Sequence, residues 1–284
     1  MSGTKVRADP VAHWDEIEPP VRAALARRVV VLGAESTGTT TLAQDLAAAL
    51  RERGGAHGLT RWVPEYGREL TVAKLAIARA RHGDGVTVYD LDWTDEDFEL
   101  VCRRQNRAEE HAARLGGPVL VCDTDVLATT VWQERYRGRS TEPVLAAARS
   151  LSPRALYLLT CHEDVPFADD GLRDGEQLRP WMTDRFREVL AAGHTPWHEL
   201  RGSRQERLEA ALGLVDRMLA RGWELADPSA SAVAGRVHRL AAPGTAVLQP
   251  SAGVPRPPGT AARRACPATA PARTVRGVPM LTAC

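Results

Sequence analysis

The sequence Val29-Val30-Val31-Leu32-Gly33-Ala34-Glu35-Ser36-Thr37-Gly38-Thr39-Thr40-Thr41-Leu42 passes from an apolar run, through a short polar loop, into a helix-forming run that ends at Leu50. The apolar run is long enough for a buried strand and contains the β-branched residues that strands prefer. A strand, a glycine-bounded loop and a helix in this order are typical of a phosphate-binding loop, in which backbone N–H groups surround an anion and the helix N-terminus points at it. This stretch therefore predicts an α/β fold built around an anion-binding turn.

The spacing of the loop matches the phosphate-binding motif G-x-x-x-x-G-K-[ST] at all but one position. Gly33 and Gly38 have the required separation, and Thr40 stands where a hydroxyl would contact magnesium. Thr39 occupies the lysine position, so the charge that normally contacts the β- and γ-phosphates is missing. Because the backbone cradle does not depend on that side chain, we expect the loop to bind nucleotide. The alternative, a tight strand-to-helix turn without a ligand, is less favoured because both glycines, the strand and the hydroxyl residues agree.

The composition is that of a globular protein whose C-terminal part differs from the rest. The chain has 284 residues, 44% of them apolar, with 37 basic and 36 acidic residues, which suits one large domain or two small ones. From residue 226 onward it has seven arginines, one acidic residue, nine of the 19 prolines and no Phe, Trp or Tyr. Such a segment buries too little apolar surface to offset its ordering entropy. We predict a folded domain over residues 1–225, with a core at about 27–221, and a disordered basic tail over 226–284 for which binding to nucleic acid is not expected.

The cysteines and the N-terminus indicate a cytoplasmic protein. Five cysteines show no paired spacing, which is usual in a reducing compartment. Acidic residues appear by Asp15 without an apolar h-region, so no signal peptide is expected. No apolar run approaches membrane-spanning length, and we expect no membrane partner. The oligomeric state is left open.

Two carboxylates are expected to face the phosphate-binding loop. The strand-like segment 61–64 leads into Glu65, and the apolar run 118–122 ends at Asp123. Ligands of parallel sheets bind at the carboxyl ends of the strands, where phosphoryl-transfer enzymes use an acidic residue to hold magnesium or to orient the attacking hydroxyl. The alternatives are structural: a glutamate favoured by a helix dipole, and an aspartate that caps the next helix. Asp125 is the better cap, and Asp123 is the better functional candidate.

Hydrophobic periodicity and helix caps predict a mainly parallel sheet of about five strands with helices on both faces. Capping boxes mark two helix starts, at Thr94 with Asp97 and at Ser203 with Glu206. The expected strands lie at 29–32, 61–64, 118–122, 155–160 and 195–200, and the expected helices at 11–25 with a break at Pro19-Pro20, 40–53, 95–115, 129–137, 142–150, 186–192 and 204–221.

The polar segment 162–180 is too long for a minimal connection, and loops of this kind are often lids. We expect its Arg173 and Arg179 to close over the phosphates and to supply the charge that Thr39 lacks. The alternative is a solvated loop whose charges pair with one another.

Four sets of short motifs follow one another along the chain. They are Gly33-Ala34-Glu35-Ser36-Thr37-Gly38, then Pro64-Glu65-Tyr66-Gly67-Arg68-Glu69, then Cys122-Asp123-Thr124-Asp125 with Thr129-Thr130, and finally Leu158-Leu159-Thr160 leading to Val165-Pro166 and Asp169-Asp170-Gly171-Leu172-Arg173-Asp174. Each motif alone is weak, but in this order and spacing they resemble the ribosylnicotinamide kinase domain of NadR-type proteins, in the P-loop kinase superfamily. The likeness covers residues 27–221.

This resemblance implies an ATP-dependent kinase that phosphorylates the ribose 5′-hydroxyl of nicotinamide riboside, giving nicotinamide mononucleotide and ADP. It implies that Mg²⁺ is bound by Thr40 and Asp123, and that Glu65, Asp123 and Arg173 have catalytic roles. Trp62, Tyr66 and Trp132 are the candidates for stacking on the nicotinamide ring. The ATP phosphates would be held by Gly33, Ala34, Glu35, Ser36, Thr37, Gly38, Thr39, Thr40, Thr41 and Arg179, and the substrate by Glu65, Tyr66, Arg68 and Asp123.

The chain departs from this family pattern in two respects. Thr39 replaces the lysine, which weakens the expectation of full activity. No nucleotidyltransferase stretch precedes the kinase-like part, and too few residues stand there for a DNA-reading helix-turn-helix. Two alternatives therefore stay open: a kinase for another nucleoside or small alcohol, and a regulatory protein that binds ATP or NAD with weak or no turnover.

Overall fold

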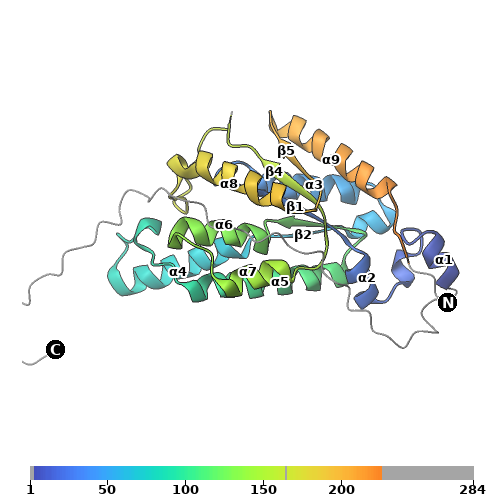
Figure 1. Cartoon of the computed structure of the whole chain (residues 1–284), viewed down its shortest axis with the longest axis horizontal. Helices are drawn as coiled ribbons and strands as arrows, with labels where there is room; N and C mark the ends of the chain where they lie inside the picture. Colours follow the sequence, from blue (N-terminus) through green and yellow to red (C-terminus); the bar gives the residue numbers. More distant parts are fainter. Residues whose placement is uncertain (1–2, 164, 226–284) are drawn as a thin grey trace, which may run out of the picture.

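The computed structural model describes residues 3–163 and 165–225 and contains one five-stranded sheet. Its strands are all parallel and lie in the order β2-β3-β1-β4-β5 (Figure 1). The predicted parallel α/β fold is thus confirmed, while the predicted disordered tail over 226–284 lies outside the described residues. The strands are β1 Arg27–Gly33, β2 Arg61–Val63, β3 Val119–Asp123, β4 Arg154–Thr160 and β5 Trp197–Leu200.

Nine α-helices are present in the described part of the chain. They are α1 Gly3–Ala8, α2 Pro19–Leu25, α3 Thr39–Glu52, α4 Tyr66–His82, α5 Asp95–Leu115, α6 Val126–Arg137, α7 Glu142–Arg149, α8 Arg179–Ala192 and α9 Arg204–Ala220. The capping boxes predicted before α5 and α9 are both formed.

Two helix predictions were wrong at their N-terminal ends. Residues 11–18 contain only a three-residue 3-10 helix, Trp14–Glu16, in place of the first part of the expected helix. The helix predicted from Phe186 begins earlier, at Arg179, because Pro180 occupies the first turn, where its missing N–H has no intrahelical partner to lose. Arg179 therefore belongs to a helix and not to the loop before it.

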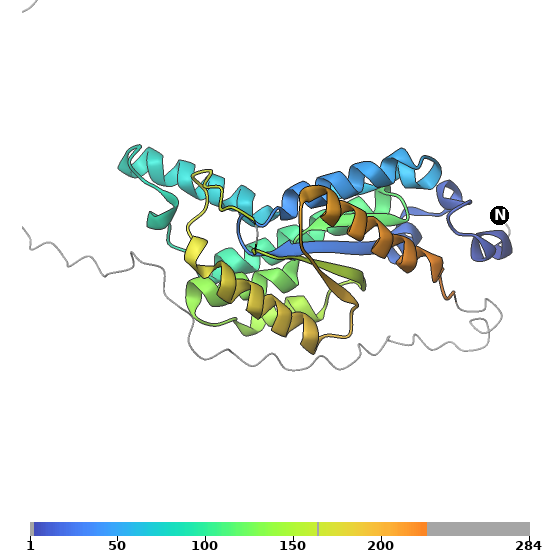
Figure 2. The ribbon, with the colours of Figure 1, turned by 90° about the horizontal axis from the view of Figure 1, so that it is seen from above.

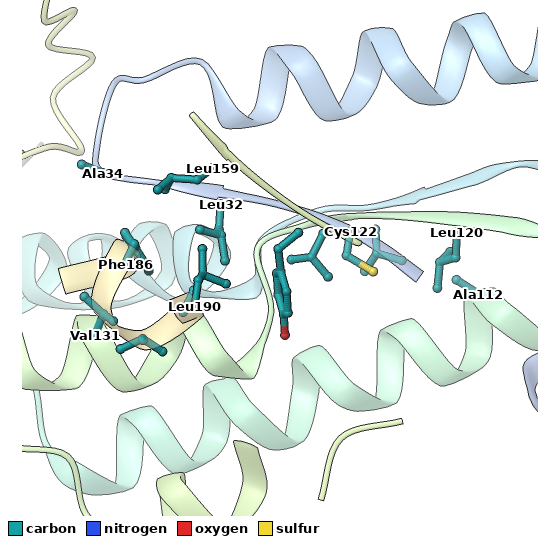
Figure 3. Packing of buried hydrophobic residues seen from close by; sticks show 14 of the residues in the cluster. Leu32, Ala34, Ala112, Leu120, Cys122, Val131, Leu159, Phe186 and Leu190 are labelled. Carbon is teal, nitrogen blue, oxygen red and sulfur yellow. The ribbon is translucent and has the colours of Figure 1, made fainter. Parts of the chain in front are cut away.

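Helices cover both faces of the sheet because its central strands are apolar on both sides. Val29 and Val31 of β1 pack against α3 and α9, which lie side by side over one face (Figure 2). Val30 and Leu32 point to the opposite face and pack with residues of β3, β4, α6 and α8 (Figure 3). Continuous apolar strands of this kind are expected in a parallel sheet that is covered on both faces.

Aromatic residues from the two ends of the described chain pack together. Trp14 is 1% exposed, and its ring centroid lies 6.4 Å from that of Trp223. The Trp223 indole N–H donates to the carbonyl of Leu25 at 2.7 Å, and the Arg27 guanidinium lies 5.1 Å from the Trp223 ring. The segment after α9 is therefore joined to α2 and the start of β1.

The register of the sheet brings the predicted site segments to one edge. Gly33 of β1 is level with Thr160 of β4, and Val31 is level with Asp123 of β3. Val63 of β2 lies beside Cys122, one residue before Asp123. Because all strands run in the same direction, the loops after β1, β2, β3 and β4 leave the sheet side by side.

Candidate functional site

The loop between β1 and α3 has the backbone geometry of an anion cradle. Gly33 permits the close approach of β4, since a Cβ on it would lie 2.2 Å from the Thr160 hydroxyl oxygen. That hydroxyl lies 2.7 Å from the Thr37 hydroxyl, which donates to the carbonyl of Ala34 at 2.8 Å. Gly38 has φ +84° and immediately precedes α3, a conformation that glycine adopts without steric cost. The positive end of α3 therefore points into the space that the loop surrounds.

A buried arginine on α9 holds the loop from behind. The Arg207 side chain donates to the carbonyl of Thr37 at 2.8 Å, to that of Cys161 at 3.2 Å and to that of Gly202 at 2.9 Å. Sequence reasoning missed this residue, because an arginine one position before the inward-facing Leu208 gives no periodic signal of its own.

The two arginines expected in the lid play different parts. Arg179 is buried, and its Nη2 donates to the carbonyls of His162 at 2.9 Å and Val165 at 2.8 Å, with Ser36 O at 3.5 Å. It ties the base of the segment 162–178 to the loop and does not line the cavity. Arg173 does line the cavity, and its Nη1 donates to the Ser36 hydroxyl at 3.3 Å.

A buried ion-pair cluster joins the loop to the lid and to α6. Arg135 lies 3.2 Å from Glu35 of the loop and also binds Asp174 of the lid, to which the Tyr136 hydroxyl donates at 3.0 Å. Burial raises the pKa of Glu35, and Arg135 opposes that shift. Gly175 must be small, because a Cβ there would lie 2.3 Å from Arg135 Nη2. Arg135 and Asp174 were not predicted to interact, because they are 39 residues apart and follow no motif spacing.

The two predicted carboxylates come together beside the loop. Burial and the nearby Asp123 raise the pKa of Glu65 to about 8, while Arg68 and Arg173 oppose the shift. Burial raises the pKa of Asp123 to about 6, and the Thr40 and Thr39 hydroxyls partly offset it. One oxygen of Asp123, Oδ1, is buried without a hydrogen-bond partner. Carboxyl groups with pKa values raised toward neutrality in a cavity are typical of functional sites.

One cavity brings most of the predicted site residues together. Of the predicted set, Gly33, Ala34, Glu35, Ser36, Thr39, Thr40, Glu65, Arg68 and Arg173 line it. Asp123 lies directly behind its wall, next to the lining residue Thr124. Thr37, Gly38, Thr41, Tyr66 and Arg179 are not among the lining residues.

Part of the cavity wall is aromatic. This part includes Trp93, Phe98, Trp132 and Tyr136. The Trp93 and Tyr136 centroids are 5.4 Å apart, and Trp132 is stacked on Tyr136 with an interplanar angle of 18° and centroids 6.4 Å apart. Of the three aromatic residues singled out in the sequence, only Trp132 reaches the cavity; Trp62 packs on the opposite face of the sheet, with α3 and β1.

The residues present fit a nucleotide with magnesium. Asp123 offers a buried oxygen that lacks a donor, and Thr40 offers a hydroxyl at the start of α3. These are hard oxygen ligands, and Mg²⁺ is commonly held by one or two protein groups together with phosphates and water. No group of three or more His, Cys, Asp or Glu that could hold a metal occurs in residues 3–163 and 165–225.

A parallel sheet of this order, a glycine-bounded loop leading into α3 and an arginine-bearing segment after β4 that lies over the loop define a P-loop domain of the kinase type. A family model described as an AAA domain matches residues 28–207. The chain belongs to this AAA domain family.

Sequence comparison points to NadR proteins. The trifunctional NAD biosynthesis/regulator protein NadR of Escherichia coli (strain K12) is 27% identical over 173 residues, which cover 61% of this chain and 37% of the relative. The protein of the same name from Salmonella typhimurium (strain LT2) is 26% identical over 173 residues, with the same shares. The chain thus spans little more than a third of the length of these curated relatives.

Solved structures support the same likeness at the level of the fold. A crystal structure of NadR protein in complex with NR has a TM-score of 0.60 and 21% identity, covering 80% of this chain and 60% of that chain. A second, in complex with NAD and AMP-PNP, has a TM-score of 0.57 and 19% identity, covering 80% and 58%. The resemblance to NadR-type proteins that the motifs predicted is therefore confirmed.

No helix among the described residues combines the length and the apolar character that crossing a bilayer requires.

Proposed function

We propose that this protein transfers the γ-phosphoryl group of ATP to the ribose 5′-hydroxyl of nicotinamide riboside, giving nicotinamide mononucleotide in NAD salvage. The observation that carries the proposal is one cavity that is lined by the P-loop, by four aromatic residues and by Glu65. Phosphoryl transfer needs mainly positioning and electrostatic stabilisation, and this arrangement provides both.

Glu65 is the proposed general base. A pKa of about 8 is close to neutral pH, where a base combines sufficient population of its ionised form with sufficient strength. Its carboxylate accepts the proton of the acceptor hydroxyl as that oxygen attacks the γ-phosphorus. Arg68, which is paired with Asp170 of the lid at 2.5 Å, holds this end of the lid near the acceptor.

The loop residues Gly33 to Thr41 hold the ATP phosphates through their backbone N–H groups, which are the donors that such a loop offers. Thr40 and Asp123 hold magnesium, which supplies neutralisation of phosphate charge when bound. Arg173 extends from the lid to Ser36 of the loop and is the arginine placed to face the transferred group.

The aromatic wall suits the nicotinamide ring. In nicotinamide riboside this ring is a flat pyridinium cation, and a cation over the face of a Trp or Tyr ring gains about 0.5–2 kcal/mol. A NadR protein has been crystallised with NR, which supports the choice of acceptor. Tyr66, in contrast, is not among the residues that line the cavity.

Thr39 favours a second candidate function. Without the lysine, the loop retains its backbone donors but has less charge with which to stabilise the transition state. The alternative is a regulatory protein that binds ATP or NAD with little turnover. A kinase for another nucleoside is the third possibility, and it differs only in the acceptor.

A coupled assay with ATP, Mg²⁺ and nicotinamide riboside distinguishes these functions. Steady ADP release that depends on the riboside, with nicotinamide mononucleotide detected by mass spectrometry, supports the proposal. Nucleotide binding by calorimetry without product supports the regulatory alternative. Turnover with another nucleoside but not with the riboside contradicts the proposed acceptor.

A further inference from the structure

A chain of buried hydrogen bonds connects the two helices that follow the carboxylates of the site. Gln105 on α5 is 1% exposed, and its Oε1 accepts from the backbone N–H of Tyr66 at 3.0 Å. Its Nε2 donates to Glu109 at 3.2 Å. The Tyr66 amide can only donate and the Glu109 carboxylate accepts, so the orientation of the Gln105 side-chain amide is fixed by its partners.

The same series of hydrogen bonds continues to α6, the helix that follows Asp123. Arg154 Nη2 donates to Glu109 at 2.6 Å, and Arg154 Nε donates to Asp125 at 2.9 Å. The other oxygen of Asp125 caps α6 by accepting from Leu127 N at 2.9 Å and Ala128 N at 3.3 Å. The Tyr157 hydroxyl adds a further bond to Asp125 at 2.9 Å.

The position of Glu65 explains why such an anchor is needed. Glu65 is the N-cap residue of α4, yet its side chain makes no capping hydrogen bond. The side-chain oxygen of an N-cap residue normally accepts from the N–H of N2 or N3, here Gly67 or Arg68. The Glu65 carboxylate lies close to Gly67, since a Cβ on Gly67 would lie 3.1 Å from its Oε1. Glu65 nevertheless makes no such bond and lines the cavity, and the N–H of Tyr66, the first residue of α4, is held by Gln105 from outside the helix.

We propose that Gln105 is a positioning residue: it anchors the start of α4 so that Glu65 keeps its carboxylate in the cavity, and through Glu109, Arg154 and Asp125 it sets Glu65 relative to Asp123. This inference rests on the proposed kinase function for its catalytic consequence. Its structural part, that Gln105 holds the N-terminus of α4, can be measured without any activity.

The test compares two glutamines that are equally buried. Gln105→Leu removes the anchor. Gln133→Leu is the matched control, because Gln133 on α6 is fully buried and bonds to Asp95 and Thr141 at 3.1 Å each, away from the cavity lining. In Gln105→Leu the rate constant kcat should fall about 10- to 100-fold, as expected for a small misplacement of a reacting group, with KM for ATP nearly unchanged. Gln133→Leu should lose comparable thermal stability but keep kcat.

A double substitution tests the donor and acceptor direction of the hydrogen bonds that run from Tyr66 through Gln105 to Glu109. Gln105→Glu alone places two carboxylates side by side and should be inactive or nearly so. Gln105→Glu combined with Glu109→Gln restores one acceptor toward Tyr66 and one donor between the two side chains. This double variant should recover kcat to within about fivefold of wild type, since one carboxylate and the same number of hydrogen bonds remain.

Amide hydrogen exchange of the peptide 64–72 gives the readout that is independent of turnover. Exchange should be faster in Gln105→Leu than in wild type and unchanged in Gln133→Leu, because local opening reports lost anchoring. Equal exchange in the two variants, or an equal loss of kcat in both, would overturn the proposal. If exchange is faster in Gln105→Leu but the wild-type protein has no kinase activity, the anchoring role of Gln105 is supported and the proposed kinase function is refuted.

Discussion

At the scale of single residues, Thr39 leaves the P-loop without the positive charge of its usual lysine. The surrounding arginines are the candidates to supply that charge. Arg135 and Arg179 are held by carboxylates or carbonyls, and Arg207 holds the back of the loop. Arg68 and Arg173 both line the cavity and both pair with Asp170, and Arg173 also contacts the loop through the Ser36 hydroxyl. Because of this contact with the loop, we propose that Arg173 acts in place of the absent lysine.

We expect Arg173→Ala to lower kcat about 100- to 1000-fold, the usual loss when one transition-state donor is removed, while ATP affinity measured by calorimetry changes much less. Thr39→Lys introduced into Arg173→Ala should restore a large part of that rate. Arg204→Ala, which removes an exposed partner of Asp45, is the control and should keep wild-type kinetics. Equal losses in rate and affinity, or no recovery with the lysine, would show that Arg173 does not substitute for it.

The raised pKa of Glu65 predicts a pH-dependent rate. With a pKa of about 8, most Glu65 is protonated at neutral pH and cannot accept a proton. The value of kcat should therefore rise between pH 7 and 9 and level off above. Glu65→Gln should abolish the reaction at every pH. A rate that is flat over this range would exclude Glu65 as the base.

The same shift predicts the pH dependence of stability. The pKa of Glu65 is about 8 in the folded state against a reference of 4.5, so the folded state disfavours the ionised form and loses stability as pH rises from about 4.5 to 8. Glu65→Gln should therefore raise the free energy of unfolding by about 1–3 kcal/mol at pH 8.5 and change it little at pH 4.5. Urea unfolding at both pH values measures this, with the exposed Glu69→Gln as a control that should show no such difference.

At the scale of elements, the junction of β1 and α3 depends on two glycines for different reasons. Gly33→Ala places a methyl group 2.2 Å from the Thr160 hydroxyl and 2.9 Å from its carbonyl, so β4 must move; we expect a loss of about 2–4 kcal/mol. Gly38→Ala meets nothing within 4 Å but keeps φ at +84°, which costs about 1 kcal/mol. Urea unfolding of the two variants should give this ranking, and the reverse order would contradict it.

Helix α6 contributes two of the four aromatic residues of the wall, Trp132 and Tyr136, and their effect should appear only in the KM for the acceptor. Trp132→Leu should raise KM for nicotinamide riboside about tenfold, in keeping with the loss of one ring–cation contact, and leave KM for ATP unchanged. Trp62→Leu is the matched control, because Trp62 packs on the other face of the sheet; it should lower stability without changing either KM. An unchanged riboside KM in Trp132→Leu would place the acceptor elsewhere.

The elements also show how far the sequence determines the site. The β1–loop–α3 unit was predictable because strand, glycines and helix are neighbours in sequence, and Glu65 and Asp123 followed from the rule that parallel strands end at one edge. The ion-pair cluster of Arg135, Glu35 and Asp174 was not predictable from the sequence, because buried ion pairs between distant segments follow no sequence period. Trp93 and Phe98 were not among the aromatic candidates, because only the tertiary fold brings them to the cavity.

At the scale of the whole molecule, the limits of the folded unit are a prediction that truncation tests. A chain ending at residue 225 keeps Trp223 on Trp14 and Leu25, and we expect its melting temperature to match that of the full chain. A chain ending at residue 221 loses this contact and should melt several degrees lower, since about 1–3 kcal/mol of aromatic burial is removed. Equal melting temperatures for the two truncations would show that the Trp14–Trp223 contact adds nothing.

The meeting of Trp14 and Trp223 has a topological consequence as well. Two ends of a folded unit that lie against each other can be joined by a short linker, and the chain can then be reopened at an exposed turn. The glycine-containing turn 83–85 after α4 is exposed and lies outside the sheet. A circularly permuted protein that starts there should fold to the same architecture, with Asp123 now ahead of the P-loop and Glu65 along the chain.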